Sequence, residues 1–434
     1  MSALTTPTPA DQGGLAPDPA VVATKGSGAR KLPIIFGVMA AVLALVLIRS
    51  SHSGDTTFQL AAETDFVTLP DITVPSSLTA WLMVVICVAL TAESVRRMLA
   101  HARQPIWIPI GFAVAWMTGF LSWAAADERI LVVSLFGGAV ALAVPLVFGA
   151  LGGVLGERAG VVNIAIEGQL LLGAFAAAIA ASTTGSPWAG LFAAAVAGAL
   201  VALVLGLFAI TYLVDQVIVG VVLNVLVLGL TNFLFRQVLT PNADTLNSPD
   251  RFQRLPIPVL GEIPLIGPIL FRQTPMVYLL YVVVALVAFG LYRTRWGLRV
   301  RAVGEHPKAA DTVGIKVNLT RYRTILLAGA IAGMGGAYYS LVSVSQFNRE
   351  MTGGAGYIAL AAVIFGKWDP IRATLAALLF GFATNLGGVL SAIGSPVPTQ
   401  FMLMLPYLVT IFAVAGLVGR SRAPAADGVP YQKQ

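Results

Sequence analysis

The chain has 434 residues, of which 57% are apolar and only 11% are charged, and its mean hydropathy is +0.84. A soluble domain carries roughly 25% charged residues because water must solvate its surface, so this composition excludes an ordinary soluble protein and predicts a chain covered by lipid. The formal net charge of +7 does not indicate nucleic-acid binding, because the basic residues are spread over many segments instead of gathering on one face.

A series of apolar runs follows from one end of the chain to the other, and each full crossing of a bilayer needs roughly 20 residues. The runs lie near 32–48, 77–92, 106–126, 131–155, 161–182, 187–210, 216–235, 276–292, 324–344, 354–366, 373–391 and 399–418. The run at 354–366 is too short to cross comfortably, so we expect a re-entrant segment or a half-helix there. The sequence therefore predicts an all-α polytopic membrane protein with about ten to twelve transmembrane helices.

The two ends of the chain differ from its apolar middle. Residues 1–31 are rich in Pro, Ala, Gly and Thr without a periodic pattern, and we interpret them as a disordered cytoplasmic tail. The run Leu32–Ile48 follows a long polar leader and no small-x-small cleavage site comes after it, which favours a retained span over a signal peptide. We expect 32–130 to form N-terminal transmembrane helices, 131–420 the main transmembrane core, and 421–434 a cytoplasmic tail.

The connecting loops alternate in charge, and this alternation predicts the orientation in the membrane. With a cytoplasmic N-terminus, the inner segments hold 20 of the 27 Lys and Arg residues. Of the other seven, four lie in the long extracytoplasmic loop 236–275, where the bias counts less. Both termini are therefore expected in the cytoplasm of a bacterial cell, and the richest inner segment is the loop 293–323 with eight basic residues.

The residues that usually carry catalysis form no constellation in this sequence. Cys87 is the only cysteine, so neither a disulfide nor a Cys-type metal cage is expected. The three histidines lack metal-ligand spacing, and Gly366-Lys367 lacks the upstream glycine of a phosphate loop. The sequence predicts a transporter with no cofactor, and an enzyme reading has no support.

The stretch 152–168 interrupts the plain hydrophobic pattern. Glycine recurs every four residues from Gly152 to Gly160, which lets membrane helices approach closely. Asn163 is expected to cap the helix that follows, and Glu167 lies near the positive end of that helix. A carboxylate at bilayer depth costs roughly 3 kcal/mol. Glu167 is therefore either satisfied structurally at the helix start or part of a broken helix that lines a translocation path.

The inner loop 293–323 contains a short helix signal. Proline suits the first position of a helix and glycine suits the position just past its end, so Pro307 to Val313 is predicted to form a two-turn helix followed by Gly314. The surrounding basic residues leave open a solvated loop that only fixes topology.

A third stretch, Met351 to Pro370, is rich in glycine at its start. Glycine permits a non-helical start at membrane depth, followed by a short half-helix. Plain close packing of small residues explains the composition about as well.

Four motifs resemble the permease subunits of ABC importers for nucleosides and simple sugars, relatives of the branched-chain amino-acid permeases. They are Gly156 to Gly168, Gly297 to Ala310, Gly354 to Pro370, and Met404 to Tyr407. They occur in the family's order over about 135–420, and the likeness is closest to the smaller permease of bacterial nucleoside importers. Ala165 stands where the family often has Gly, and the extra helices in 32–130 have no functional account.

The resemblance implies a role for the inner loop, because in this family a short cytoplasmic helix docks into a separate ATPase subunit. The family motif reads Glu-Ala-Ala, three residues, then Gly, whereas this chain has Lys where the family has Glu. The residues that the resemblance assigns to ATPase coupling are Glu305, Pro307, Lys308, Ala309, Ala310 and Gly314. The implied partners are that ATPase, a second permease in a heterodimer, an extracytoplasmic substrate-binding lipoprotein, and the lipid membrane.

Polar residues within the apolar runs are the candidates for the substrate path. They are Asn163, Glu167, Asn224 and Asn232, because amides and carboxylates pair with base or ribose edges. Each of them could equally make a helix–helix hydrogen bond, worth roughly 0.6 kcal/mol in a membrane. The leading hypothesis is an ATP-driven nucleoside importer. The alternatives are a permease for simple sugars, an ion-coupled secondary transporter working alone, and a membrane scaffold.

Overall fold

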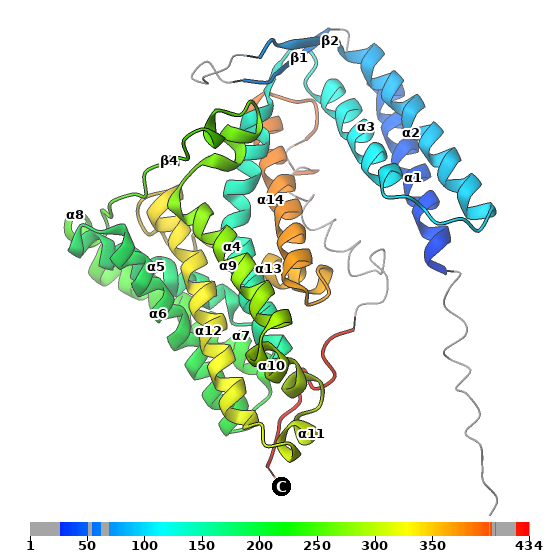
Figure 1. The fold of residues 1–434 in the computed structure, drawn as a ribbon. Helices are drawn as coiled ribbons and strands as arrows, with labels where there is room; N and C mark the ends of the chain where they lie inside the picture. The colour runs from blue at the N-terminus through cyan, green and yellow to red at the C-terminus, as the bar shows by residue number, and fades with distance from the viewer. Residues whose placement is uncertain are drawn as a thin grey trace, which may run out of the picture. The chain divides into compact units, whose positions relative to one another are not determined.

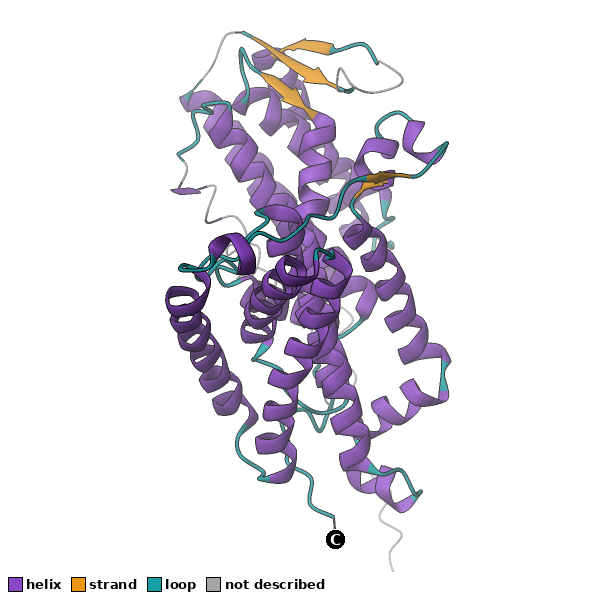
Figure 2. Ribbon diagram, turned by 90° about the vertical axis from the view of Figure 1, so that its left-hand side faces the viewer, coloured by secondary structure: helices purple, strands orange, loops and turns teal. Residues whose placement is uncertain are grey.

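The structure is a computed structural model that describes residues 27–50, 54–61, 69–398, 400, 401, 404 and 422–433. Helices account for most of this part of the chain, and the strands are few and short (Figure 2). Contacts divide the chain into two compact units, one of residues 1–53 and 76–123 and one of residues 54–75 and 124–434.

The first unit contains three apolar helices, α1 (Ser27–Arg49), α2 (Ser76–Leu99) and α3 (Trp107–Ala124). The rings of Phe36 on α1 and Phe112 on α3 stack with their centroids 4.1 Å apart, and both side chains are buried with Cys87 of α2. The indole of Trp116 donates to the carbonyl of Met39 at 3.0 Å. Ring packing and this hydrogen bond therefore hold the three helices together.

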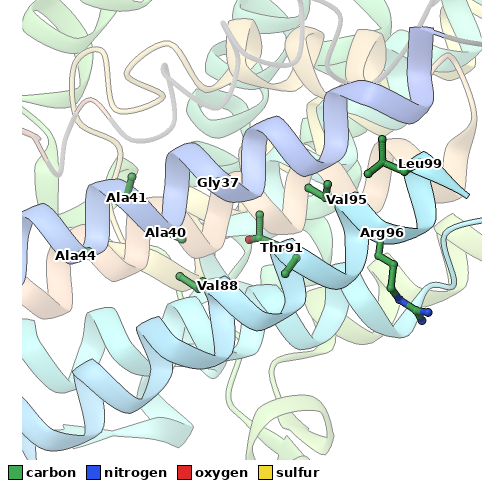
Figure 3. Close-up of a pocket in the computed structure, with 10 residues that line it drawn as sticks. Gly37, Ala40, Ala41, Ala44, Val88, Thr91, Val95, Arg96 and Leu99 are labelled. Atoms are coloured by element: carbon green, nitrogen blue, oxygen red, sulfur yellow. The ribbon is translucent and has the colours of Figure 1, made fainter.

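An apolar groove runs between α1 and α2 (Figure 3). Small residues of α1, from Gly37 to Ala44, form one wall, and Val88 and Val95 of α2 lie on the other. Arg96 stands at one end of the groove and is paired with Glu93 at 2.7 Å. Among the described residues, no buried polar side chain that lines the groove lacks a hydrogen-bond partner. The groove is therefore interpreted as a packing surface.

Two small sheets accompany the helices of the second unit, in segments where only loops were expected. The strands are β1 (Asp55–Gln59), β2 (Ile72–Pro75) and β3 (Arg129–Leu131), in the order β2-β1-β3, and β4 (Leu255–Pro256) with β5 (Arg272–Gln273). Thr57 pairs with Thr73 across the antiparallel β1–β2 ladder and with Arg129 across the parallel β1–β3 ladder. The β-branched residues of β1 (Asp-Thr-Thr-Phe-Gln) and β2 (Ile-Thr-Val-Pro) suit strands.

The second unit carries the remaining helices. They are α4 (Val132–Arg158), α5 (Ile166–Thr184), α6 (Pro187–Gly206), α7 (Gln216–Leu234), α8 (Ala243–Leu246), α9 (Pro275–Arg293), α10 (Arg295–Glu305), α11 (Pro307–Thr312), α12 (Val317–Tyr338), α13 (Ala355–Phe365) and α14 (Pro370–Ala392). A π-helical turn extends α6 to Thr211, α7 to Leu239 and α12 to Ser343.

Ten helices in the described part of the chain are long and apolar enough to cross a membrane. This confirms the predicted polytopic helical fold. The short run predicted at 354–366 is α13, an 11-residue helix. The run predicted at 399–418, the Met404–Tyr407 motif and the tail 1–31 lie wholly or largely outside the described residues.

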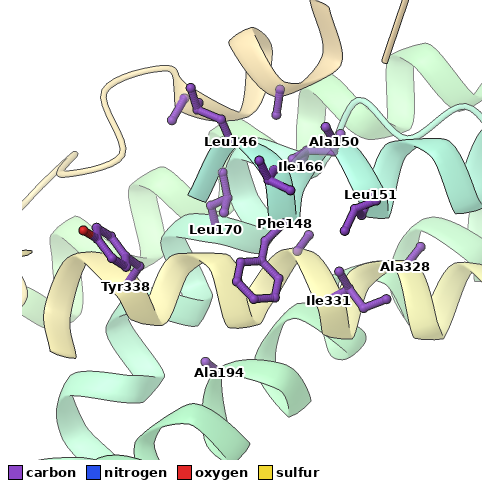
Figure 4. Packing of buried hydrophobic residues seen from close by; sticks show 14 of the residues in the cluster. Leu146, Phe148, Ala150, Leu151, Ile166, Leu170, Ala194, Ala328, Ile331 and Tyr338 are labelled. Atoms are coloured by element: carbon purple, nitrogen blue, oxygen red, sulfur yellow. The ribbon is translucent and has the colours of Figure 1, made fainter. Parts of the chain in front are cut away.

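The core of the second unit is formed by α12 packing against α4, α5 and α6, with α13 and α14 against α4 (Figure 1). Phe148 of α4 is fully buried beside Leu170 of α5 and Ile331 of α12 (Figure 4). A Cβ atom on Gly198 of α6 would overlap the carbonyl oxygen of Gly329 on α12. A Cβ atom on Gly152 of α4 would likewise lie 2.7 Å from the carbonyl oxygen of Ala328 on α12, so this glycine lets the two helices approach closely, as predicted.

Many large apolar side chains remain exposed on the outer faces of the second unit. Phe192 of α6 is 72% exposed, Val225 of α7 is 64% exposed and Leu286 of α9 is 62% exposed. Such contiguous apolar surfaces are unfavourable in water, so these faces contact lipid or another membrane subunit.

Candidate functional site

The first feature of the site is that α5 begins inside the protein rather than at the end of α4. The side chain of Ile166, the first residue of α5, lies against Gly149 and Gly153 in the middle of α4. With a rise of 1.5 Å per residue, Gly149 is about 14 Å from the end of α4 at Arg158. The chain therefore turns back after α4 and starts α5 alongside α4, well before the end of that helix.

Glu167, in the first turn of α5, accepts three hydrogen bonds from the glycine-rich segment that leads into the first turn of α13. Its Oε1 accepts from the hydroxyl of Thr352 at 2.6 Å and from the amide of Gly354 at 2.9 Å, and its Oε2 accepts from the amide of Gly356 at 2.6 Å. A Cβ atom on Gly356 would collide with the backbone of Glu167. The carboxylate thus joins the start of α5 to the start of the short helix α13.

Asn224, in the middle of α7, ties the same two segments to a third. Its Oδ1 accepts from the amide of Gly168 at 2.8 Å. Its Nδ2 donates to the carbonyl of Ile164 at 2.9 Å and to the hydroxyl of Tyr357 at 3.2 Å. The side chain is only 5% exposed. Asn224 therefore fixes the start of α5 against α7 and α13.

These groups surround a cavity of about 240 Å³. Its wall combines the polar side chains with apolar ones of α5 and α7, namely Glu167, Leu171, Asn224, Val225, Leu228, Glu350, Thr352, Gly353, Gly354 and Tyr357. The cavity opens to the surface of the unit, because Val225 and Tyr357 on its wall are 64% and 50% exposed. A few converging polar groups in an apolar wall are the usual composition of a small-molecule site.

Asn163 has a different role from the predicted one. Helix α5 is capped by Ala165 without a side-chain hydrogen bond, so the prediction that Asn163 caps the helix is wrong. The side chain of Asn163 instead exchanges two hydrogen bonds with that of Gln169, at 3.0 and 3.1 Å, and both residues are fully buried. The side-chain amide of Gln169 pairs with both polar atoms of the Asn163 side chain. Asn163 is therefore not a cap, and it is not among the residues that line the cavity.

Asn232, at the last turns of α7, lies next to the cavity without lining it. Its Nδ2 donates to the carboxylate of Glu350 at 3.3 Å, and Glu350 belongs both to the cavity wall and to a second cavity of about 530 Å³. That second cavity is lined by Phe235, Asn348, Arg349 and Glu350. The Arg349 guanidinium lies over the Phe235 ring, 5.9 Å from its centroid.

The short helix predicted in the inner loop is present as α11, one residue shorter than expected at its end. Lys308 and Ala309 are exposed, whereas Ala310 is 4% exposed and packs inward. Gly314 follows with φ of +85° and its amide donates to the carbonyl of Asp311 at 2.9 Å, a left-handed conformation that favours glycine. Glu305 ends α10, and Pro307 begins α11.

Several residues of the site were not identified from the sequence. Three of them, Glu350, Thr352 and Tyr357, lie in or beside the glycine-rich stretch. The only sequence signal for them was that this stretch comes directly before an apolar run. Trp368 lies between α13 and α14, where its indole donates to the carboxylate of Glu157 and its carbonyl accepts from Arg158 at 2.9 Å. No group of three metal-ligating side chains occurs among residues 27–433 where the structure describes them.

Residues 134–414 match the family described as branched-chain amino acid transport system, permease component. The guanosine ABC transporter permease protein NupQ of Bacillus subtilis is 43% identical over 67% of this chain and 94% of its own length. The nucleoside ABC transporter permease protein NupC of Lactococcus lactis is 39% identical over 67% of this chain and 93% of its own length.

The putative glucose ABC transporter permease protein TsgC13 of Haloferax volcanii is 33% identical over 67% of this chain and 93% of its own length. Bacillus subtilis and Lactococcus lactis each hold a second, more distant match with the same description, 25% and 22% identical. No solved structure matches. The chain therefore belongs to the family of branched-chain amino acid transport system permease components, and it is a multi-pass membrane transport subunit.

Proposed function

We propose that this chain is a permease subunit of an ATP-driven importer of nucleosides, and that substrate passes the cavity lined by Glu167, Asn224 and Tyr357. The single observation that carries this proposal is the meeting of the start of α5 with the glycine-rich start of the short helix α13 around one carboxylate, Glu167, among apolar helices. Interrupted helices at the midplane are where transporters usually bind their substrates. The two relatives named for guanosine and nucleosides support the substrate class.

After the hydrogen bonds within the cavity are formed, one acceptor on Glu167 and one donor on Tyr357 remain to contact a nucleoside. A carboxylate can accept about four hydrogen bonds, and Glu167 accepts three. The hydroxyl of Tyr357 accepts from Asn224, which leaves its own proton to donate within the described part of the chain. One acceptor and one donor near an exposed aromatic ring match the polar edges and flat face of a base.

The cavity is too small to be a whole site. Ligand sites usually enclose about 300–1,000 Å³, and this one encloses about 240 Å³ and opens beside Val225. We infer that a second permease covers this opening, so that the path runs between the two subunits. The paired matches in two bacteria support a heterodimer.

The other partners follow from the orientation. The bias of basic residues supports a cytoplasmic position for α11 and for both termini. The exposed face of α11, with Lys308, Ala309 and the region around Gly314, is the proposed contact with the ATPase subunit. Substrate would arrive at the opposite side on an extracytoplasmic binding lipoprotein.

A sugar importer is the second candidate, because the Haloferax volcanii relative is named for glucose. The test is uptake of labelled guanosine, adenosine, uridine and ribose in a strain that lacks only this chain. A loss limited to nucleosides and restored by re-expression is the expected result. Loss of ribose uptake alone would overturn the nucleoside assignment, and unchanged uptake of all four would overturn both.

The same strain separates an ATP-driven importer from an ion-coupled carrier. We expect uptake to continue when the proton gradient is collapsed while ATP stays high. A carrier that works alone would stall under that condition.

A further inference from the structure

Residues 422–433, here called the strap, pack against the inner end of the second unit, beside α10 and α11 (Figure 1). The amide of Ala426 donates to the carbonyl of Gly304 at 2.9 Å. The amide of Ala425 donates to the carboxylate of Glu305 at 3.2 Å. The strap is therefore hydrogen-bonded to the last turn of α10, immediately before α11 begins.

Tyr431 anchors the strap to α11 itself. Its side chain is 7% exposed and belongs to a small buried cluster with Val303, Ala310 and Val317. Ala310 is the inward-facing residue of α11. Burial raises the pKa of the Tyr431 hydroxyl, and so does its hydrogen bond to Asp311 of α11. The apolar cluster and the hydrogen bond together attach the strap to the short helix.

Arg321, in the first turns of α12, joins the strap to the loop that follows α4. Its guanidinium is 1% exposed, and a buried cation must be hydrogen-bonded to be tolerated. Its Nε donates to the carbonyl of Ala159 at 3.2 Å, and one terminal nitrogen donates to the carbonyl of Val429 at 3.0 Å. The planar fork of arginine suits such a double contact.

Glycine at two positions allows the strap and this loop to lie in close contact. Gly160 has φ of +80°, and a Cβ atom there would lie 2.9 Å from the carbonyl oxygen of Ala426 and 2.8 Å from the Arg321 guanidinium. Gly428 of the strap lies against Val162. The fit is therefore too tight for a larger residue at Gly160.

We propose that the strap is a mechanical link that couples α11 to the start of α5. It is fixed to α10 and α11 on one side and to loop residues 159–162 on the other, and this loop leads within seven residues to Glu167. A displacement of α11 would then move the loop and, with it, the starts of α5 and α13 beside the cavity. The inference rests on the proposed function, in which α11 contacts the ATPase.

The test compares Tyr431→Ala with Gln432→Ala, which alters an exposed neighbour in the same strap. Both variants are assembled with the partner permease and the ATPase in proteoliposomes, the binding lipoprotein is added, and guanosine uptake and ATP hydrolysis are measured together. We expect Tyr431→Ala to lower the amount of guanosine carried per ATP at least fivefold while hydrolysis continues. Gln432→Ala should match the parent protein. An unchanged ratio in Tyr431→Ala would overturn the link.

A second variant separates failure of the strap from failure of the proposed function. Ala309→Asp alters the exposed face of α11 and leaves the strap in place. Loss of uptake in Ala309→Asp together with a normal ratio in Tyr431→Ala would overturn the strap alone. Normal uptake in Ala309→Asp would overturn ATPase docking at α11, and the strap proposal with it.

A cross-link keeps the proposal testable where Tyr431→Ala does not accumulate in the membrane. The substitutions Val162→Cys in the loop and Val429→Cys in the strap, which flank the contact between Gly428 and Val162 and alter neither α11 nor the cavity wall, are made together in a Cys87→Ser background and joined by a short bismaleimide. Because the strap acts while docked, uptake is expected to persist after cross-linking. Loss of uptake on cross-linking, with uptake intact in the unlinked double variant, would mean that the strap must undock, and it would overturn the proposal.

Discussion

Removing the acceptor at Glu167 should release the glycine-rich segment that it holds. In Glu167→Ala the amides of Gly354 and Gly356 and the hydroxyl of Thr352 lose their partner. Each buried group left unpaired costs about 1–3 kcal/mol. The cavity admits water on one side, so we expect a total of about 2–4 kcal/mol. Since 1.4 kcal/mol is about tenfold in an equilibrium, the docked arrangement should lose at least about tenfold in population.

Glutamine at position 167 should remove only part of the stabilisation that alanine removes. Its oxygen can still accept from Thr352 and Gly354, but its amide group then faces the N–H of Gly356, donor against donor. That contact should cost about 1–3 kcal/mol. Uptake is therefore expected to fall about tenfold in Glu167→Gln and further in Glu167→Ala.

The assay is initial uptake of labelled guanosine, normalised to the amount of the chain in the membrane. Glu262→Gln makes the same chemical change at an exposed glutamate in the loop 236–275 and serves as the control. If uptake and expression were unchanged in both Glu167 variants, the proposed role of this carboxylate would be wrong. Equal losses in the Glu262→Gln control would show that the effect is not specific to the cavity.

Three further outcomes are expected. Gly314→Pro should abolish uptake with the chain still in the membrane, because proline cannot adopt φ of +85°, whereas Gly314→Asn should retain much of it. Gly333→Ala should destabilise the solubilised protein by about 1–3 kcal/mol in thermal unfolding, because its Cβ would overlap the Ala194 carbonyl of α6. Gly229→Ala on α7, with nothing within 4 Å, should be neutral or stabilising. Burial raises the pKa of Asp427 to about 7. Ionisation therefore opposes docking of the strap, which should weaken as pH rises from about 4 to 7 and stay level above that. Maleimide labelling of Ala426→Cys relative to exposed Gln432→Cys should increase over that range, and Asp427→Asn should remove the increase.

Composition and periodicity were sufficient to predict the class of fold. Apart from 354–366, the apolar runs are long enough to predict spans one by one. The helix boundaries that glycine and proline mark, such as Pro307 and Gly314 around α11, agree with the structure to within one residue. Such local features do not depend on what the chain folds against. The small sheet around Thr57 was not predicted from the sequence, because the residues that pair with Thr57 are Thr73 and Arg129, which lie in other segments of the chain.

The candidate site shows the same division between local and distant information. The cost of burying a charge in a membrane singled out Glu167 from sequence alone, but that cost says nothing about which groups offset it. The groups are the hydroxyl of Thr352 and two backbone amides, 185 to 189 residues away. Backbone amides carry no sequence signature, since every residue except proline has one.

Asn163 and Asn224 illustrate why residue type alone could not assign the site. Both are asparagines in apolar surroundings, and both are nearly fully buried. Asn163 exchanges its hydrogen bonds with Gln169 on the same stretch of chain, so it is satisfied without the cavity. Asn224 has no polar neighbour on its own helix to pair with and reaches two other stretches of chain, the start of α5 at Ile164 and Gly168 and the start of α13 at Tyr357. The difference is made by the chain turning back after α4, which brings the start of α5 to the depth of Asn224. The position of the start of α5, and not the residue type, is therefore what makes Asn224 part of the candidate transport path.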